Sequence, residues 1–135
     1  MKVIYKKWED GEGLEEVQAK IYTEVSGLPA RAEEIRHRNN DRGKDSTLYA
    51  LTEDGDPLAY ITSYRYDDGT DRAGIGYPWS LKNCPEDAKD TIFKDLMKHL
   101  ESMDDIKEIR TSVTLNSKTR NEQIKYFEER GFTEV

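Results

Sequence analysis

The chain has 135 residues, of which 35% are hydrophobic and 36% charged, and its formal net charge is −7. This length predicts one domain over residues 1–135, and an acidic chain is attracted neither to nucleic acid nor to an anionic membrane surface. No run approaches the ~20 apolar residues of a membrane helix, and a single cysteine with two histidines predicts neither an internal disulfide nor a metal site, so we expect a cytoplasmic protein.

The first half of the chain predicts a strand, two helices and a hairpin. Residues 2–8 alternate apolar and polar side chains, as a half-buried strand does. Apolar residues spaced three and four apart make a helical stripe over residues 14–25, and residues 30–38 predict a shorter helix followed by a polar loop. Residues 46–52 and 58–66 flank a turn and are typical of two antiparallel strands.

The third run of alternating residues is irregular. Residues 72–81 alternate like a strand but contain Pro78, which predicts a distortion or a sheet edge at that point. Pro85 then begins a helix whose apolar residues recur at a helical spacing up to Leu100. This helix has the strongest apolar stripe in the chain.

The last third predicts one more strand and one more helix. Residues 106–115 alternate as a strand, and Thr119 with Glu122 predicts a capping box at the start of a helix. Residues 132–135 begin a further strand. The order β-α-α-β-β-β-α-β-α predicts an α/β fold of the mixed α+β kind, a central, mostly antiparallel sheet flanked by helices.

The last helix carries the residues by which the chain resembles a known family. Its sequence NEQIKYFEERGF, residues 121–132, and the order of the elements resemble the GNAT superfamily of N-acetyltransferases. In that family the last helix typically reads Asn-x-x-Ala-x-x-Phe-Tyr-Glu-x-x-Gly-Phe. The resemblance implies transfer of an acetyl group from acetyl-CoA to an amine acceptor, either a small molecule or a peptide.

The same resemblance implies where the cofactor lies. The family holds the cofactor pyrophosphate in a glycine-containing loop ahead of the long helix, on backbone N–H groups and the positive helix end. Here the matching segment, residues 85–90, has no glycine and contains three carboxylates, whose charge Lys82 and Lys89 would offset. Asn121, displaced by one residue from the family's asparagine, is a further cofactor candidate. The backbone expected to pair with the pantetheine arm belongs to Trp79, Ser80 and Leu81.

The candidate proton donor lies in the last helix. In the family, a tyrosine there often protonates the departing thiolate. Counting back from Gly131, that position holds Phe127, and Tyr126 is turned about 100° away from it on the helix. Tyr126 is therefore either the proton donor or a packing residue. Residues 73–81 contain no carboxylate that could act as a general base. The reaction would therefore rest on the proximity of the two reactants and on water as the base.

Acceptor candidates come from a basic cluster and from aromatic residues. Residues 36–44 are basic in an otherwise acidic chain, so Arg36 and Arg38 are candidates to contact an acidic substrate, a phosphate or a partner, unless the segment is a solvated loop. Tyr64 and Tyr77 lie on strands where they would line an aromatic cleft, or simply cover a sheet face.

A second class of function keeps the fold without the chemistry. The turn without glycine, Phe127 and the ending GFTEV also fit a catalytically inactive binding or regulatory domain, such as the degenerate half of a tandem acetyltransferase. An incomplete sheet leaves an open edge, which predicts a homodimer or a partner domain that covers it. A chain that is a fragment of a longer protein explains the same ending equally simply.

Overall fold

The computed structural model describes residues 1–43, 45–66, 71–114 and 117–134. Its elements, in chain order, are β1 (Val3–Lys7), α1 (Leu14–Ser26), α2 (Ala32–Arg42), β2 (Thr47–Thr52), β3 (Pro57–Arg65), β4 (Arg72–Ile75), β5 (Trp79–Ser80), α3 (Glu86–Glu101), β6 (Glu108–Arg110) and α4 (Arg120–Glu129). The order matches the order that the sequence predicts, except that the irregular strand is divided into β4 and β5.

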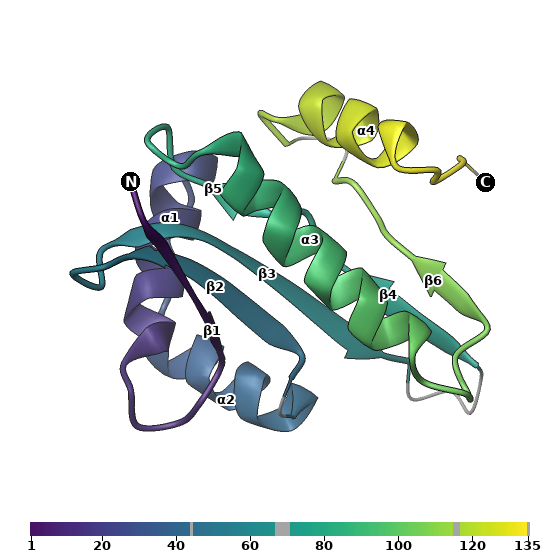
Figure 1. The fold of residues 1–135 in the computed structure, drawn as a ribbon, viewed down its shortest axis with the longest axis horizontal. Coiled ribbons are helices and arrows are strands. Elements are labelled where there is room, and N and C mark those ends of the chain that lie inside the picture. Colours follow the sequence, from purple (N-terminus) through teal and green to yellow (C-terminus); the bar gives the residue numbers. More distant parts are fainter. Residues whose placement is uncertain (44, 67–70, 115–116, 135) are drawn as a thin grey trace.

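The strands form one mixed sheet with helices on both faces (Figure 1). The strand order is β1-β2-β3-β4-β6, and β5 pairs with β3. Every pair is antiparallel except β4 with β6. The predicted α+β architecture is therefore confirmed.

Each face of the sheet has its own buried cluster. Helices α1 and α2 cover one face, where Ile21 and Tyr49 are fully buried. Helix α3 crosses the other face and α4 lies beside it (Figure 1). The apolar stripe of α3 is almost completely buried, as its spacing predicts, and consists of Ala88, Ile92, Leu96 and Leu100.

Helix α2 is longer than the sequence predicts. It continues to Arg42 through residues predicted to form a polar loop. Asn39 is completely buried there, and its side-chain amide donates hydrogen bonds to Gln18 Oε1 at 3.0 Å and to the Tyr49 hydroxyl at 3.3 Å. These contacts with α1 and β2 outweigh the poor helix propensity of asparagine, so the expected loop was wrong.

The strand predicted over residues 106–115 is much shorter. Only Glu108–Arg110 forms β6, because β4 ends at Ile75 and residues 111–114 have no strand beside them to pair with. The remaining predicted position, Leu115, lies outside the described residues. The prediction of a ten-residue strand was therefore wrong.

Two predicted features of the last helix are also absent from the described residues. Thr119 makes no capping hydrogen bond to the helix backbone, and its Oγ1 instead accepts a hydrogen bond from Gln123 Nε2 at 2.7 Å. Residues 132–134 form no strand, because the Phe132 N–H turns back to the Phe127 carbonyl at 3.0 Å and the two rings pack together. The capping box and the strand over these residues were thus wrong.

Candidate functional site

The chain contains one extra residue between β4 and β5. Ser63 of β3 lies opposite Ile75, whereas Tyr60 lies opposite Trp79. Two residues of β3 therefore face three residues, 76–78, which is the signature of a β-bulge. The distortion that the sequence predicts at the proline is confirmed.

Beyond the bulge, β5 has an edge that no described residue pairs with. The Leu81 N–H donates to a β3 carbonyl at 2.9 Å, so in an antiparallel ladder Ser80, one residue before it, directs its N–H away from β3. On that side β6 accompanies β4 only as far as the pair Gly74 and Arg110. The sheet therefore divides beside Ser80.

Helix α3 begins close to this division with no side-chain cap. Pro85 is its N-cap residue, and the exposed carboxylates of Glu86 and Asp87 make no capping hydrogen bond. The first N–H groups of a helix without a cap point ahead of it and carry its partial positive charge. Neither carboxylate caps the helix, so its first N–H groups remain able to bind an anion. The negative charge of the two carboxylates opposes such binding.

A cluster of charged and aromatic side chains ties α3 to α4. Lys89 donates from Nζ to the Tyr77 hydroxyl at 2.7 Å and lies 4.7 Å from the centre of the Tyr126 ring. The Tyr126 hydroxyl donates to Asp90 Oδ1 at 3.2 Å, and Arg130 both stacks on Tyr126 and pairs with the same carboxylate oxygen. Burial raises the pKa of Tyr126, so this phenol stays protonated.

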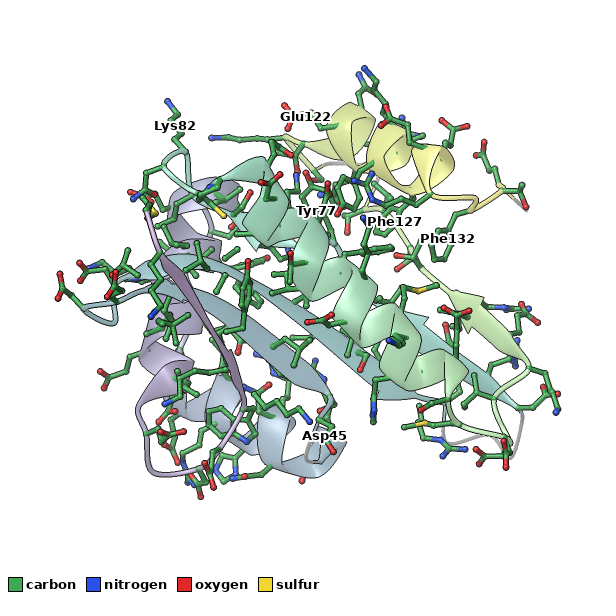
Figure 2. The ribbon with its side chains drawn as sticks, in the orientation of Figure 1. Asp45, Tyr77, Lys82, Glu122, Phe127 and Phe132 are labelled. Atoms are coloured by element: carbon green, nitrogen blue, oxygen red, sulfur yellow. The ribbon has the colours of Figure 1, made fainter. Side chains whose placement is uncertain are left out.

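The structure brings together some of the predicted cofactor residues. Tyr77, in the bulge, contacts Lys89 and lies edge-on to Trp79 at 5.6 Å, so it connects α3 with β5. Leu81 follows directly after β5. Lys82 is exposed on the turn, far from Tyr77 in Figure 2, and Asn121 is exposed on α4. The position of the family's tyrosine holds Phe127, which is buried against Tyr77 and Phe93.

A hollow of about 400 Å³ lies on the opposite face of the sheet. Residues of α1, α2 and the loop between them form its walls, while β3 and β5 form its floor. Trp79 belongs to this floor and lies edge-on to Tyr22 of α1 at 5.4 Å. Trp79, the residue before Ser80, thus contributes to both the division in the sheet and the hollow.

The hollow carries more positive than negative charge. Three arginines and one glutamate line it among the described residues, and Glu34 lies 3.7 Å from Arg31 and 3.9 Å from Arg38. Arg42 donates to Asn39 Oδ1 at 3.1 Å, but within the described ranges it pairs with no carboxylate. Burial, and then the charge of Arg38, lower the pKa of Arg42.

One tyrosine of the floor presents a neutral hydroxyl. Burial raises the pKa of Tyr60, so its phenol remains protonated at ordinary pH. In the part of the chain that the structure describes, this hydroxyl has no hydrogen-bond partner. It can therefore donate to a bound molecule.

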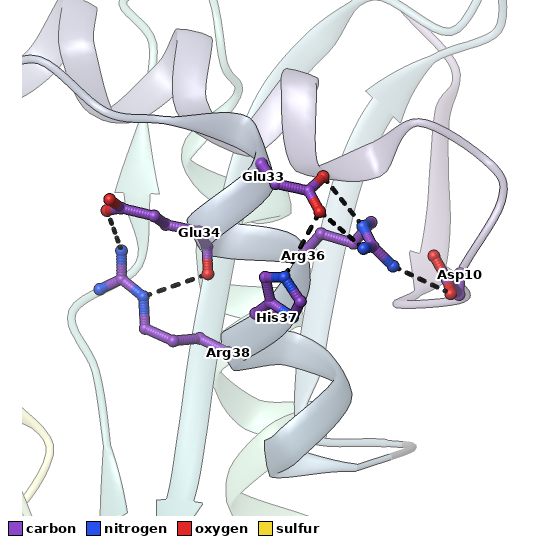
Figure 3. A network of polar contacts seen from close by, with 6 residues as sticks. All are labelled: Asp10, Glu33, Glu34, Arg36, His37 and Arg38. Carbon is purple, nitrogen blue, oxygen red and sulfur yellow. Dashed lines mark hydrogen bonds and ion pairs between the residues drawn. The ribbon is translucent and has the colours of Figure 1, made fainter.

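The basic cluster of α2 is divided between two faces (Figure 3). Arg36 pairs with Glu33 at 2.6 Å and with Asp10 at 3.5 Å, and it does not line the hollow. His37 lies 3.4 Å from the same Glu33. Arg38 faces the hollow, whereas Lys44 lies outside the described residues. Only part of the cluster is thus placed to contact an acceptor.

Tyr64 and Tyr77, the two aromatic acceptor candidates, do not line the hollow. Tyr64 packs its ring over Gly74, where a Cβ atom would come within 2.3 Å of it, and contacts Tyr66 edge-on. Tyr77 lies on the α3 side of the sheet. Arg42 belongs to the basic segment and Tyr60 to the strand expected to line an aromatic cleft, but the sequence did not single out either of them as an acceptor residue. The spacing of Arg38 and Arg42, four residues apart, was a usable signal only if α2 was known to continue that far.

Other chemistries find little support. Burial, followed by the nearby Glu86, raises the pKa of the Cys84 thiol to about 11, so the thiolate nucleophile is scarce at neutral pH. Among the described residues, no three histidine, cysteine, aspartate or glutamate side chains gather as metal ligands would. Nor does this part of the chain contain a helix with the length and apolar character needed to span a bilayer.

No family model and no curated protein sequence matches the chain. Solved structures match it over almost its whole length. The NatC complex bound to Gag peptide and CoA aligns with a TM-score of 0.78 at 14% identity, over 100% of this chain and 87% of that chain. A ribosomal-protein-alanine N-acetyltransferase from Brucella melitensis biovar Abortus 2308 aligns at 0.71 and 10% identity, over 99% and 94%.

A GNAT-family acetyltransferase from Streptococcus pneumoniae TIGR4 aligns with a TM-score of 0.69 at 13% identity, over 98% of this chain and 88% of that chain. The chain therefore shares its fold with these three structures, and in this chain the mixed sheet divides beside a bulged strand. Its fold is that of the GNAT superfamily, and the predicted resemblance is confirmed at the level of the fold.

Proposed function

We propose that the chain binds a CoA thioester where the sheet divides and transfers its acyl group to an amine held in the hollow. The observation that carries this proposal is the edge of β5, where the outward N–H of Ser80 lies beside the uncapped start of α3. One neighbour of the same fold, the NatC complex, was solved with CoA and a peptide. Acetyl-CoA, as the resemblance implies, is the proposed donor.

The residues present fit CoA in two ways. The backbone of Trp79, Ser80 and Leu81 would pair with the amide-bearing arm of CoA as it would with a neighbouring strand. The first N–H groups of α3 and the ammonium of Lys89 offer positive charge to phosphates. Glu86 and Asp87 weaken this attraction, so we expect modest affinity.

When bound, the thioester supplies an acyl carbon that a neutral amine attacks and a thiolate that leaves. The chain's part is to position the amine and to disfavour its protonated form. Arg38 and Arg42 would lower the pKa of an ammonium group beside them, because like charges repel. Glu34 is already shared by two arginines, so the released proton would go to water.

Isothermal titration with CoA tests the cofactor site. We expect binding to the wild-type chain and about tenfold weaker binding to Lys89→Ala, because an ammonium that contacts phosphate is lost. Lys94→Ala removes the same charge from an exposed position on the same helix and should leave the affinity within twofold. Absence of heat with the wild-type chain at millimolar CoA would overturn the proposed function.

Tyr126→Phe tests the proton-donor role that the resemblance implies. Because the Tyr126 hydroxyl donates to Asp90, which also holds Arg130, we expect it to tie α3 to α4 and not to protonate a leaving group. The turnover number with acetyl-CoA should therefore change by less than about threefold, and the free energy of unfolding by about 1 kcal/mol or less. A hundredfold loss of turnover at unchanged stability would instead establish Tyr126 as the proton donor.

The alternative is a catalytically inactive binding or regulatory domain of the same fold. It is favoured by the contacts of Tyr77, Lys89 and Tyr126, which fill space between α3 and α4. Under this alternative, CoA gives no heat while the hollow still binds its ligand. A homodimer or a partner domain along the sheet edge remains a prediction for either function.

A further inference from the structure

We infer that the hollow selects an amine acceptor that carries a carboxylate close to its amine, and that Arg42 and Arg38 are the residues that select it. The amine part of this inference rests on the proposed function. The carboxylate part rests on the hollow itself, and it can be tested without any transfer reaction.

The first argument is an uncompensated charge. Arg42 is half-buried, lines the hollow, and pairs with no carboxylate among the described residues. Placing a guanidinium away from water without an opposite charge is unfavourable, so such groups in folded proteins usually have an anionic partner. The chain as a whole has a net charge of −7, whereas the charged residues that line this hollow are three arginines and one glutamate. A bound anion would supply the missing partner.

The second argument is that Arg42 is held in place before any ligand arrives. Its guanidinium donates to Asn39 Oδ1 at 3.1 Å, and Asn39 in turn donates to Gln18 and to Tyr49. The Tyr49 hydroxyl completes the network with a 2.6 Å hydrogen bond to Gln18 Oε1. A guanidinium fixed by a buried network loses little freedom on binding, so it favours affinity and specificity.

The third argument concerns the charge of the ligand. Glu34 lies close to both Arg31 and Arg38, so Arg42 is the arginine of the hollow that has no carboxylate partner among the residues the structure describes. One singly charged carboxylate is enough to pair with Arg42, because Arg31 and Arg38 already lie close to Glu34. The Tyr60 hydroxyl, without a partner in the described residues, can donate a further hydrogen bond.

Two peptides test the inference with wild-type protein. They are identical except for an N-terminal aspartate or asparagine, and both have an amidated C-terminus, so that one carboxylate is the only difference. With acetyl-CoA as donor, we expect kcat/KM to be about tenfold higher for the aspartate peptide. This preference should shrink as sodium chloride is raised, because salt screens the attraction. Equal values for the two peptides would overturn the inference.

Three single substitutions and one double variant locate the preference. Arg42→Gln and Arg38→Gln should each reduce it, and together they should remove it. Arg36→Gln makes the same charge change on the outer face of the same helix and should keep it, since Arg36 pairs with Glu33 and Asp10. A preference that survives in the double variant, with a native circular dichroism spectrum, would contradict the inference. Arg38 is exposed, so its variant gives a result even if Arg42→Gln fails to fold.

Titration of each peptide in the absence of CoA separates this inference from the proposed function. Stronger binding of the aspartate peptide without any CoA binding would support the carboxylate site and overturn the acyltransferase. CoA binding with transfer to both peptides at equal rates would support the acyltransferase and overturn the carboxylate site. Failure of one proposal is therefore distinguishable from failure of the other.

Discussion

Asn39→Leu is expected to lower the free energy of unfolding by about 3 kcal/mol, measured by urea denaturation followed by circular dichroism. Asn39 is completely buried, and leucine has the same branching at Cγ but cannot hydrogen bond. An N–H group of Arg42 would lose its acceptor, and the Thr47 hydroxyl, 3.5 Å from Asn39 Oδ1, would lose a weaker one. Each buried polar group left without a partner costs about 1–3 kcal/mol.

Asn40→Leu is the matched control, because the next residue of the same helix is exposed. Its effect on the free energy of unfolding should stay within about 0.5 kcal/mol. A loss of less than about 1 kcal/mol in Asn39→Leu would show that the buried network does not hold α2 against α1 and β2. Since this network also fixes Arg42, Asn39→Leu should weaken the preference for the aspartate peptide, whereas Asn40→Leu should keep it.

The helices with apolar stripes could be predicted from the sequence, and the features that depend on distant partners could not. The spacing that ends at Leu100 places α3 on the sheet, because a helix with one apolar face must bury it. Asn39 gave no such signal, since its side-chain amide donates to Gln18 and Tyr49, which lie in other elements of the chain. The length of β6 likewise depends on where β4 ends.

The candidate site likewise has features that could be predicted from the sequence and features that could not. Pro78 predicted the distortion, and the resemblance pointed to Ser80 and Lys89, which the structure places around the bulge and the start of α3. The sequence could not show that Arg36 faces solvent while Arg42 faces a hollow. That difference depends on one further turn of α2, residues 39–42, and on the β3 floor beneath it.

Ser80→Pro is expected to abolish CoA binding while leaving the fold intact. Proline removes the outward N–H of β5 and replaces it with a ring that projects toward the proposed cofactor arm. The antiparallel ladder to β3 should survive, because Leu81 keeps its 2.9 Å hydrogen bond and the residue before a proline is compatible with a strand. The free energy of unfolding should therefore change by about 1 kcal/mol or less.

Ser80→Ala provides the control, because it removes the hydroxyl but keeps the N–H. Its affinity for CoA in isothermal titration should stay within twofold of the wild-type value. If both variants bind CoA equally well, the cofactor does not use the edge of β5, and a different part of the chain must hold it. If only Ser80→Pro loses binding, the backbone of one residue accounts for the loss, because the two variants share the missing hydroxyl and differ in the N–H and in the proline ring.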